Sequence, residues 1–153
     1  MTSELYSFAG DTTGPMTAAR PPRVRQATLP VARQSPGMAR QVARDALMSW
    51  HLTHLTDTVI LLISELVTNA VLHARTNGLG LALQLEVHRT WLRIEVHDAD
   101  LREPQPRTPA GLEESGLGLV LVDALADRWG VEETPAGKAV WAELDTQPDG
   151  EPL

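Results

Sequence analysis

The sequence predicts an α+β fold, a two-layer α/β sandwich in which helices cover one face of a mixed, mostly antiparallel sheet. Segments in the second half alternate apolar and polar residues with the period of two that strands with one buried face show. Segments in the first half repeat apolar residues with the period of a helix. The expected order is β-α-α-β-β-α-β-β, and the helices are the natural cover for the apolar face of the sheet.

Length and composition limit the classes of protein. The 153 residues fit one ordinary domain. A net charge of −7 without a long basic run argues against nucleic acid as a direct partner. The absence of cysteine excludes disulfides and thiolate metal sites. The longest apolar run, Val59 to Ile63, is too short to span a bilayer, and no signal-peptide pattern opens the chain. We therefore expect a cytoplasmic protein with no membrane partner.

The expected domain occupies residues 26–145. Residues 1–25 are rich in glycine and proline and show little periodicity, so they are predicted to form a flexible N-terminal tail. Residues 146–153 form a polar C-terminal tail. The first expected strand runs from Ala27 to Ala32, and Pro30 assigns it to an edge of the sheet.

The first helix is expected to begin at Ser35 and Pro36, because a capping serine followed by proline at the first helical position marks a helix start. It is expected to end near Trp50. Its opposite side is basic, with Arg40 and Arg44. The apolar face is predicted to contain Met38, Val42, Ala46 and Trp50.

The second helix is expected from about Asp57 to Ala74, with Asn77-Gly78 after it. Spacing by four puts Glu65, Asn69 and His73 in one stripe on this helix. The predicted core face contains Val59, Ile63, Leu66, Val67, Ala70, Val71 and Ala74. The stripe shares its own face with Leu61, Leu62 and Leu72. Because a solvent face does not usually carry three leucines, we expect the stripe to face a pocket.

A carboxylate and an amide at this spacing suit a magnesium-nucleotide site. Magnesium prefers oxygen ligands and usually takes one or two from the protein beside substrate phosphates. The side-chain oxygen of Asn69 is a candidate ligand, and Glu65 can take a proton or hold the water shell of the metal. The alternative at this point is a helix with a few polar residues on its wet side.

A hairpin is predicted from Leu79 to His88 and from Trp91 to Asp98, with its turn at Arg89-Thr90. The alternation puts Asp98 on the apolar face that packs on the helices. A buried carboxylate there must be hydrogen-bonded, and the exocyclic amino group of adenine is a fitting donor. The alternative is that Asp98 only forms a turn.

A long proline-containing segment, Leu101 to Ser115, is predicted to be a lid or binding loop. Gly116-Leu117-Gly118-Leu119 then opens a third helix, where exposed amides and the helix dipole favour phosphate. The alternative to phosphate binding is that the two glycines only form an ordinary turn, as glycine pairs often do. Gly130 is expected to end the helix. Its apolar side is predicted to contain Val120, Leu121, Ala124, Leu125 and Trp129.

The last predicted hairpin joins Val131–Thr134 to Lys138–Leu144.

Two familiar nucleotide motifs are excluded. Leu121 stands where the dinucleotide fingerprint needs a third glycine, and the one lysine, Lys138, is followed by Ala139 and so does not form a P-loop.

In this order the motifs resemble those of the GHKL (histidine kinase-like) ATPase superfamily, and within it the small anti-sigma-factor serine/threonine kinases of actinobacteria. Glu65-Leu66-Val67-Thr68-Asn69-Ala70 matches the first box of the family. Asp98 matches the acidic residue of the second box, and Gly116-Leu117-Gly118-Leu119 matches the third. Trp129-Gly130 and Gly137-Lys138-Ala139-Val140-Trp141-Ala142 look like the typical end of this branch.

The resemblance implies a Bergerat-type ATP-binding fold that uses ATP and Mg²⁺. It implies that Asn69 chelates the metal, that Glu65 is the general base or positions water, and that Asp98 reads adenine. Gly116 and Gly118 would meet phosphate. The other residues expected at the nucleotide are His73, Leu117 and Leu119.

The implied activity is phosphorylation of an anti-anti-sigma partner by a kinase that also binds a sigma factor, with a homodimer as one expected state. One departure leaves an alternative open. The second box of the family commonly reads Asp-x-Gly-x-Gly, whereas this chain reads Asp98-Ala99-Asp100-Leu101-Arg102. The alternative is a regulatory module that binds ATP without catalysis or only docks a partner.

Overall fold

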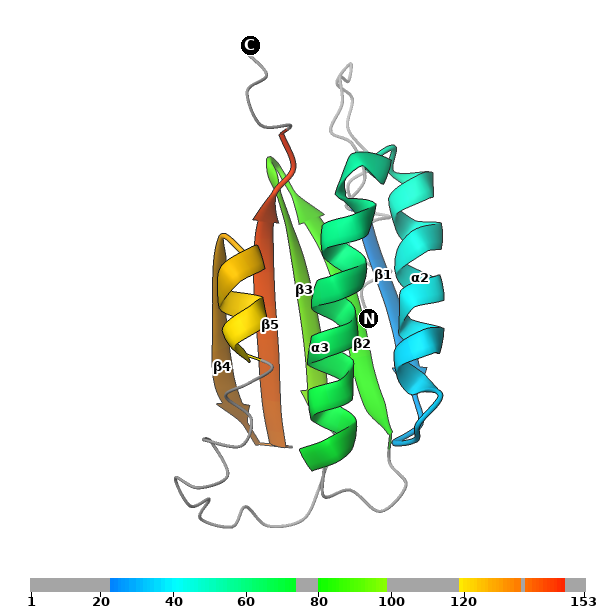
Figure 1. Ribbon diagram of the computed structural model, residues 1–153, viewed down its shortest axis with the longest axis vertical. Coiled ribbons are helices and arrows are strands. Elements are labelled where there is room, and N and C mark those ends of the chain that lie inside the picture. The colour runs from blue at the N-terminus through cyan, green and yellow to red at the C-terminus, as the bar shows by residue number, and fades with distance from the viewer. Residues whose placement is uncertain (1–22, 74–79, 99–118, 136, 148–153) are drawn as a thin grey trace, which may run out of the picture.

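The computed structural model describes residues 23–73, 80–98, 119–135 and 137–147. Two α-helices and a short 3₁₀ turn follow the first strand in the chain. A third helical segment, residues 119–125, follows the third strand in the chain and precedes the fourth (Figure 1). The elements are β1 (Arg23–Leu29), α2 (Ser35–Ser49), η1 (Thr53–Leu55), α3 (Thr56–His73), β2 (Leu81–His88), β3 (Trp91–Asp98), β4 (Arg128–Thr134) and β5 (Gly137–Asp145).

The five strands form one sheet in the order β1-β2-β3-β5-β4. Every pairing between neighbours in this sheet is antiparallel, so the expectation of a mixed sheet was wrong on this point. Both α2 and α3 lie over the same face of the sheet, and the helical segment 119–125 stands on that side too (Figure 1). The predicted α+β sandwich with helices on one face is confirmed.

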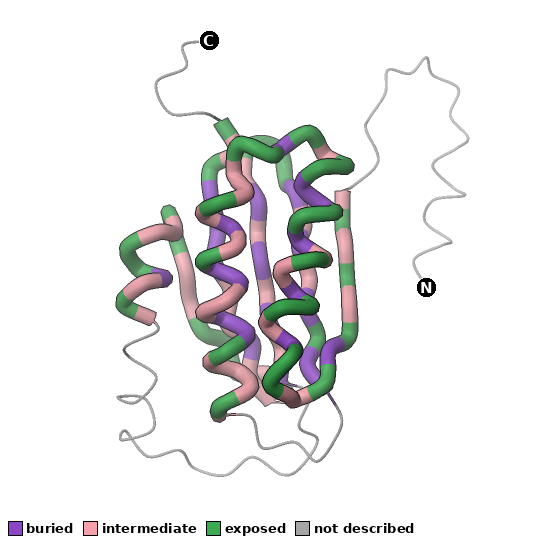
Figure 2. The backbone as a smooth tube through the Cα atoms, turned by 45° about the vertical axis from the view of Figure 1, so that its right-hand side comes forward, coloured by how far each residue is buried: buried purple, intermediate pink, exposed green. Residues whose placement is uncertain are grey.

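The core lies between the helices and the covered face of the sheet (Figure 2). The alternation predicted for the central hairpin is confirmed, since every second residue of β2 and β3 is buried. The buried residues of these two strands are Leu81, Leu83, Leu85, Val87, Leu92, Ile94, Val96 and Asp98.

The first strand begins earlier than predicted and ends before Pro30. It pairs with β2 from Arg23, opposite Val87, to Leu29, opposite Leu81. Residues 23–25, which were assigned to the tail, therefore belong to the sheet, and the predicted edge position is confirmed. The basic residues fit in a strand because a long side chain can lie along apolar surface while its charged end stays in water. The guanidinium of Arg25 lies 5.9 Å from the ring centre of Trp50.

Helix α2 keeps its predicted start but not its predicted cap. Its predicted apolar face is confirmed for Ala46, which is buried, and for Val42 and Trp50, which pack partly buried against the core. Ser35 is fully buried, and its hydroxyl donates to the carbonyl of Pro30 instead of capping the helix. The side of α2 in the core is alanine-rich, whereas Met38 is exposed. Small residues allow a helix to approach its neighbours closely, which explains why alanines rather than Met38 lie on the buried side of α2. The buried residues are Ser35, Ala39, Ala43, Ala46 and Leu47.

Helix α3 is the central helix of the core. Together with η1 it forms one helix, Thr53–His73, that is long and apolar enough to cross a membrane by length and composition. Part of its apolar surface lies in the core between the helices and the sheet. The buried residues are Val59, Leu62, Ile63, Leu66 and Val67.

The third helix ends sooner than predicted. It is helical to Leu125, and Trp129 and Gly130 belong to β4. Gly130 pairs with Trp141 in the sheet, and a Cβ atom at Gly130 would lie 2.7 Å from Cζ2 of Trp141. Gly130 is therefore needed for the close approach of an indole ring, not to stop a helix.

The face of the sheet that points away from α2 and α3 contains a group of ion pairs. The carboxylate of Glu143 accepts hydrogen bonds from Nη1 of Arg93 at 2.7 Å and from Nε of Arg128 at 2.8 Å. Its side chain is only 7% exposed. Arg93 also pairs with Glu95, and its guanidinium lies 4.3 Å from the ring centre of Trp141. A buried carboxylate needs such partners to remain charged without a large cost in free energy.

Glu95 is held in the same group. Burial disfavours its charged form, but hydrogen bonds from Arg93 and His97, together with their charges, outweigh that effect and lower the pKa of Glu95 below its usual 4.5. The ring Nε2 of His97 lies 2.8 Å from Oε1 of Glu95.

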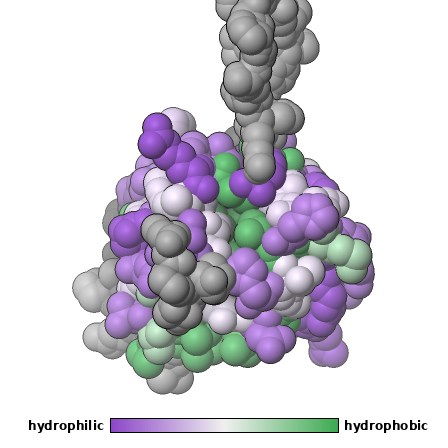
Figure 3. Space-filling model, turned by 90° about the horizontal axis from the view of Figure 1, so that it is seen from above, coloured by the Kyte–Doolittle hydropathy of each residue, from purple (hydrophilic) through white to green (hydrophobic). Residues whose placement is uncertain are grey.

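The end of the sandwich at the Arg89-Thr90 turn is tied by contacts over long sequence distances. The amide of Thr146 donates to the carbonyl of Thr90 at 2.8 Å, and Nε2 of His54 lies 2.8 Å from the carbonyl oxygen of Thr146. Seen from this end, hydrophilic residues surround a narrow apolar strip (Figure 3).

The first prediction concerns Gly130. We expect Gly130→Ala to lower the free energy of unfolding by about 1–3 kcal/mol, because the new methyl group overpacks the site against Trp141. Gly37→Ala is the matched control: its Cβ would meet only Nη2 of Arg40, at 3.5 Å, and alanine favours a helix. Urea unfolding of both variants measures the difference. Equal stability of Gly130→Ala and the wild type would contradict the packing argument.

The second prediction concerns the pH dependence of stability. Because the pKa of Glu95 is lowered on folding, its contribution is present above the usual pKa of 4.5 and is lost as the pH falls through the folded-state pKa. We expect Glu95→Gln to cost about 1 kcal/mol near neutral pH, and this difference from the wild type to shrink in acid. Urea unfolding near neutrality and at about pH 3 tests it. The exposed Glu132 gives the control, Glu132→Gln. A pH-independent difference for Glu95→Gln would rule out this linkage.

Candidate functional site

The stripe of Glu65, Asn69 and His73 lies on a flank of α3, and all three residues are half-buried. The opposite flank is occupied, because Oγ of Ser64 accepts a hydrogen bond from Nη1 of Arg40 on α2 at 3.1 Å. At about 100° per residue, Asn69 is about 140° around the helix from Ser64. The stripe therefore faces away from α2, toward the side where the helical segment 119–125 stands (Figure 1).

The leucines that suggested a pocket do not share the position of the stripe. Leu62 is fully buried in the core, whereas Leu61 is 47% exposed and Leu72 is 71% exposed. The argument from three leucines beside polar residues was therefore wrong. The physical reason is that Leu62 lies about 80–100° around the helix from Leu61 and Leu72, so that packing on the sheet buries Leu62 and leaves the other two in solvent. The position of the stripe follows from the contact with α2 instead.

Asp98 lies at the end of β3 on the covered face, where it is only 6% exposed. The predicted burial of this carboxylate is confirmed. Its neighbours across the sheet are Leu81 on β2 and Lys138 on β5. An apolar residue and a cation therefore stand on the two sides of Asp98.

The structure brings the end of β3 and the C-terminal half of α3 to the same end of the sandwich (Figure 1). The two elements are also in contact. The buried carboxylate of Asp98 and the half-buried amide of Asn69 thus lie toward this end of the molecule, and Glu65 lies one turn before Asn69, near the middle of α3.

Part of the predicted site lies outside the described residues. This applies to Gly116, Leu117, Gly118 and the predicted lid, Leu101 to Ser115. Leu119 is described: it begins the helical segment and packs partly buried against the core. In this segment Val122 is the fully buried residue, while Val120 is 66% exposed, so the predicted apolar side was wrong for Val120.

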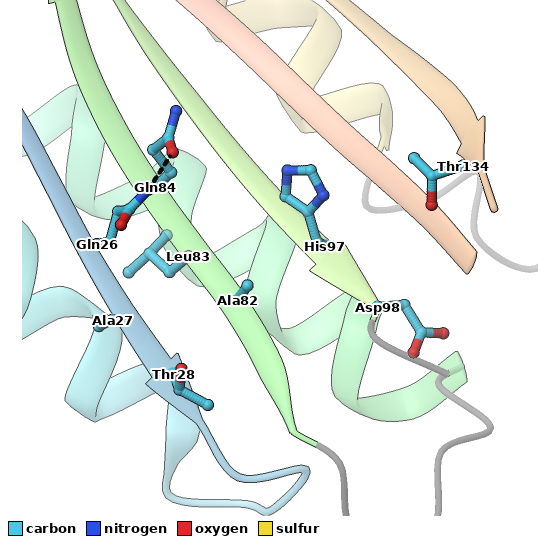
Figure 4. Close-up of a pocket in the computed structure, with 9 residues that line it drawn as sticks. All are labelled: Gln26, Ala27, Thr28, Ala82, Leu83, Gln84, His97, Asp98 and Thr134. Carbon is cyan, nitrogen blue, oxygen red and sulfur yellow. Dashed lines mark hydrogen bonds between the residues drawn. The ribbon is translucent and has the colours of Figure 1, made fainter. Parts of the chain in front are cut away.

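A surface hollow of about 510 Å³ lies on the other face of the sheet (Figure 4). Nε2 of Gln26 donates to Oε1 of Gln84 there at 2.7 Å. The alternation of β3 separates the faces, so His97 points into this hollow while Asp98 reaches only its end. The hollow is therefore distinct from the flank of α3. Its lining residues are Gln26, Ala27, Thr28, Ala82, Leu83, Gln84, His97, Asp98 and Thr134.

Lys138 is the residue of this region that sequence reasoning missed as a site residue. It was noticed only as the one lysine of the chain. The alternation of the last strand indicated which face it occupies, but the pairing of β5 with β3 brings it opposite Asp98. That pairing joins strands separated by a helix and another strand.

Comparison with known proteins agrees with this architecture. Residues 29–144 match the family model of the histidine kinase-like ATPase domain. An uncharacterized protein of Streptomyces coelicolor is 48% identical over 62 residues, which cover 39% of this chain and 55% of that relative.

A solved structure has a similar fold. The crystal structure of the RsbU and RsbW domains of Rv1364c from Mycobacterium tuberculosis matches with a TM-score of 0.61 and 19% sequence identity. The match covers 84% of this chain and 33% of that chain. This chain therefore spans about half of the curated relative and a third of the structural one.

The family match runs from Leu29, the last residue of β1, to Leu144, the last but one residue of β5. It therefore includes the central helix, the buried carboxylate and nearly all of the sheet beyond β1. The chain belongs to the histidine kinase-like (GHKL) ATPase family.

Proposed function

We propose that this protein binds ATP with Mg²⁺ and is a serine/threonine protein kinase that phosphorylates an anti-anti-sigma factor and thereby regulates the availability of a sigma factor. Membership of an ATPase family supports ATP as the ligand. The observation that carries the proposal is the buried carboxylate of Asp98, which lies at the same end of the sandwich as the half-buried stripe of α3.

In this proposal Asn69 is the magnesium ligand. Its amide oxygen is a hard donor on a half-buried flank. Among the described residues, no three acidic or histidine side chains gather into a metal cluster. Such a donor set fits an ion that takes most of its ligands from phosphate and water. When bound, the ion would neutralise negative charge on the phosphates.

Glu65 is the proposed general base. It lies one turn before Asn69 on the same stripe and remains partly exposed. A carboxylate in that position can accept the proton of a serine or threonine hydroxyl that a protein substrate presents from solution. Phosphoryl transfer otherwise requires mainly positioning and charge neutralisation, which a small site can supply.

Asp98 is the proposed reader of the base. An ionised carboxylate only accepts hydrogen bonds, so it suits the amino group of adenine and opposes the carbonyl oxygen that guanine has in its place. A buried site built on such a bond rejects a ligand that leaves it unpaired. The other residues proposed to contact the nucleotide are His73, Gly116, Leu117, Gly118 and Leu119.

The proposed partners are proteins, namely the sigma factor, the anti-anti-sigma factor and a second copy of the chain in a homodimer. We propose a cytoplasmic location, with no direct binding of nucleic acid or membrane. The net charge of −7 supports the exclusion of nucleic acid, because phosphate backbones attract basic proteins.

A non-catalytic module that binds ATP, or only docks a partner, is the second candidate. One observation favours it: Asp98-Ala99-Asp100-Leu101-Arg102 lacks the glycines that commonly follow the acidic residue in the family. Without them the backbone has fewer conformations near the nucleotide.

The third prediction tests nucleotide binding. We expect wild-type protein to bind ATP in a magnesium-dependent manner, and Asn69→Ala to weaken this binding by about 10–100-fold, a loss typical of disturbed metal coordination. Isothermal titration calorimetry with and without Mg²⁺ measures both. Thr68→Ala is the control, because Thr68 is an exposed neighbour on the outer side of α3. Absence of ATP binding by the wild type would exclude the kinase and leave the docking module.

The fourth prediction separates catalysis from binding. We expect Glu65→Gln to retain the fold and ATP affinity but to transfer the γ-phosphate to a purified anti-anti-sigma protein about 10²–10⁴-fold more slowly, because the amide cannot take a proton. Single-turnover transfer of labelled phosphate gives the rate. Equal rates for the two proteins would show that Glu65 is not the base.

A further inference from the structure

The only lysine of the chain stands beside the buried carboxylate that we assign to base reading. Lys138 and Asp98 are directly opposite each other in the β3–β5 ladder. On the other side Asp98 faces Leu81, an apolar residue. Of the two residues directly opposite Asp98 in the sheet, only Lys138 carries a positive charge.

Both residues belong to the covered face of the sheet. Opposite residues of an antiparallel pair point to the same side, and their Cβ atoms are about 4.5–5.5 Å apart. Asp98 lies on the side of the buried Leu92, Ile94 and Val96, and Lys138 precedes Val140 by two positions on that same side. A lysine side chain can reach a carboxylate across this distance.

The burial of the two residues differs in an informative way. Asp98 is 6% exposed, whereas Lys138 is half-buried. An aliphatic stem can lie along the strand while the ammonium group stays hydrated. Such a group offers charge to a buried carboxylate without being fully desolvated itself, which is the costly part of a buried ion pair.

A neighbouring cation also determines which hydrogen bonds the carboxyl group can form. Beside a positive charge a carboxyl group is held in its ionised form, and this form only accepts. A protonated carboxyl group would donate and could then bind the carbonyl oxygen of guanine. The protonation state of Asp98 therefore decides between adenine and guanine.

We propose that Lys138 is a positioning residue for base selection, which keeps the side chain of Asp98 ionised and directed toward the amino group of adenine. This inference rests on the proposed binding of ATP. It adds that selection of ATP over GTP depends on a residue of β5 as well as on Asp98 itself.

The register supplies a matched control. Lys138 has a second cross-strand neighbour, Glu133 on β4, which is exposed. Glu133→Gln removes a carboxylate from the other side of the same lysine. If Lys138 acted only as a general surface charge, removal of either neighbouring carboxylate, Asp98 or Glu133, would change base selection in the same way.

The fifth prediction uses displacement of a fluorescent ATP analogue by ATP and by GTP. Wild-type protein should prefer ATP, and Lys138→Met, which has a similar length but no charge, should reduce the ratio of ATP to GTP affinity by about tenfold, the scale of one hydrogen bond to a charged group. Lys138→Arg should keep the preference. Glu133→Gln should leave the ratio unchanged. In an Asp98→Asn background, Lys138→Met should have no further effect on the ratio.

Thermal unfolding without nucleotide gives an independent readout. Lys138→Met should lower the melting temperature of the wild type more than that of Asp98→Asn, as coupled residues do. An unchanged ratio of ATP to GTP affinity in Lys138→Met, or an equal loss in both backgrounds, would overturn the inference even if the melting temperatures are coupled. Failure of the wild type to bind ATP would instead refute the proposed function on which the inference rests, so the two failures are distinguishable.

Discussion

The packing of α3 on one face of the sheet determines which of its flanks carries the candidate residues Glu65 and Asn69. Its buried apolar residues fix the rotation of the helix, and the bond from Arg40 to Ser64 fixes which flank meets α2. Glu65 and Asn69 lie on the flank that faces away from α2, and both are half-buried. The helix and β3, whose last residue is Asp98, end at the same end of the sandwich.

The face of the sheet that points away from α2 and α3 is stabilised by ion pairs rather than by apolar packing. It buries the charge of Glu143 between Arg93 and Arg128, with indole rings of tryptophan against both guanidinium groups. Such a group is favourable only when all of its members are present, since removal of one partner leaves a desolvated charge. The two faces thus divide the tasks: the apolar face holds the helices and the candidate site, and the charged face holds the last two strands in register with β3.

The proposed site combines residues of two strands with residues of one helix. Base selection is assigned to strand residues, Asp98 and Lys138, whose positions are fixed by ladders on both sides of β3 and β5. Metal binding and proton transfer are assigned to one well-packed helix. Sites built on strands and helices hold their groups more accurately than sites built on loops. Discrimination between bases, which needs accurate positioning, is therefore assigned to the most constrained part of the structure.

The sequence by itself determined the elements whose signal is local. The period of two in β2 and β3 predicted their bounds at the turn and the burial of Asp98, and the helical period predicted α3, because one buried face imposes its repeat directly on the residues. Contacts between distant segments required the tertiary structure. Leu61 and Leu62 have the same hydropathy and lie about 100° apart around α3, and the packing of the helix on the sheet decides that Leu62 is the one in the core. The sequence of Trp129 and Gly130 predicted a helix end. In the structure both residues belong to β4, and Gly130 makes room for the indole of Trp141. The pairing of Asp98 with Lys138 depends on the register of β5 on β3, which no local period specifies.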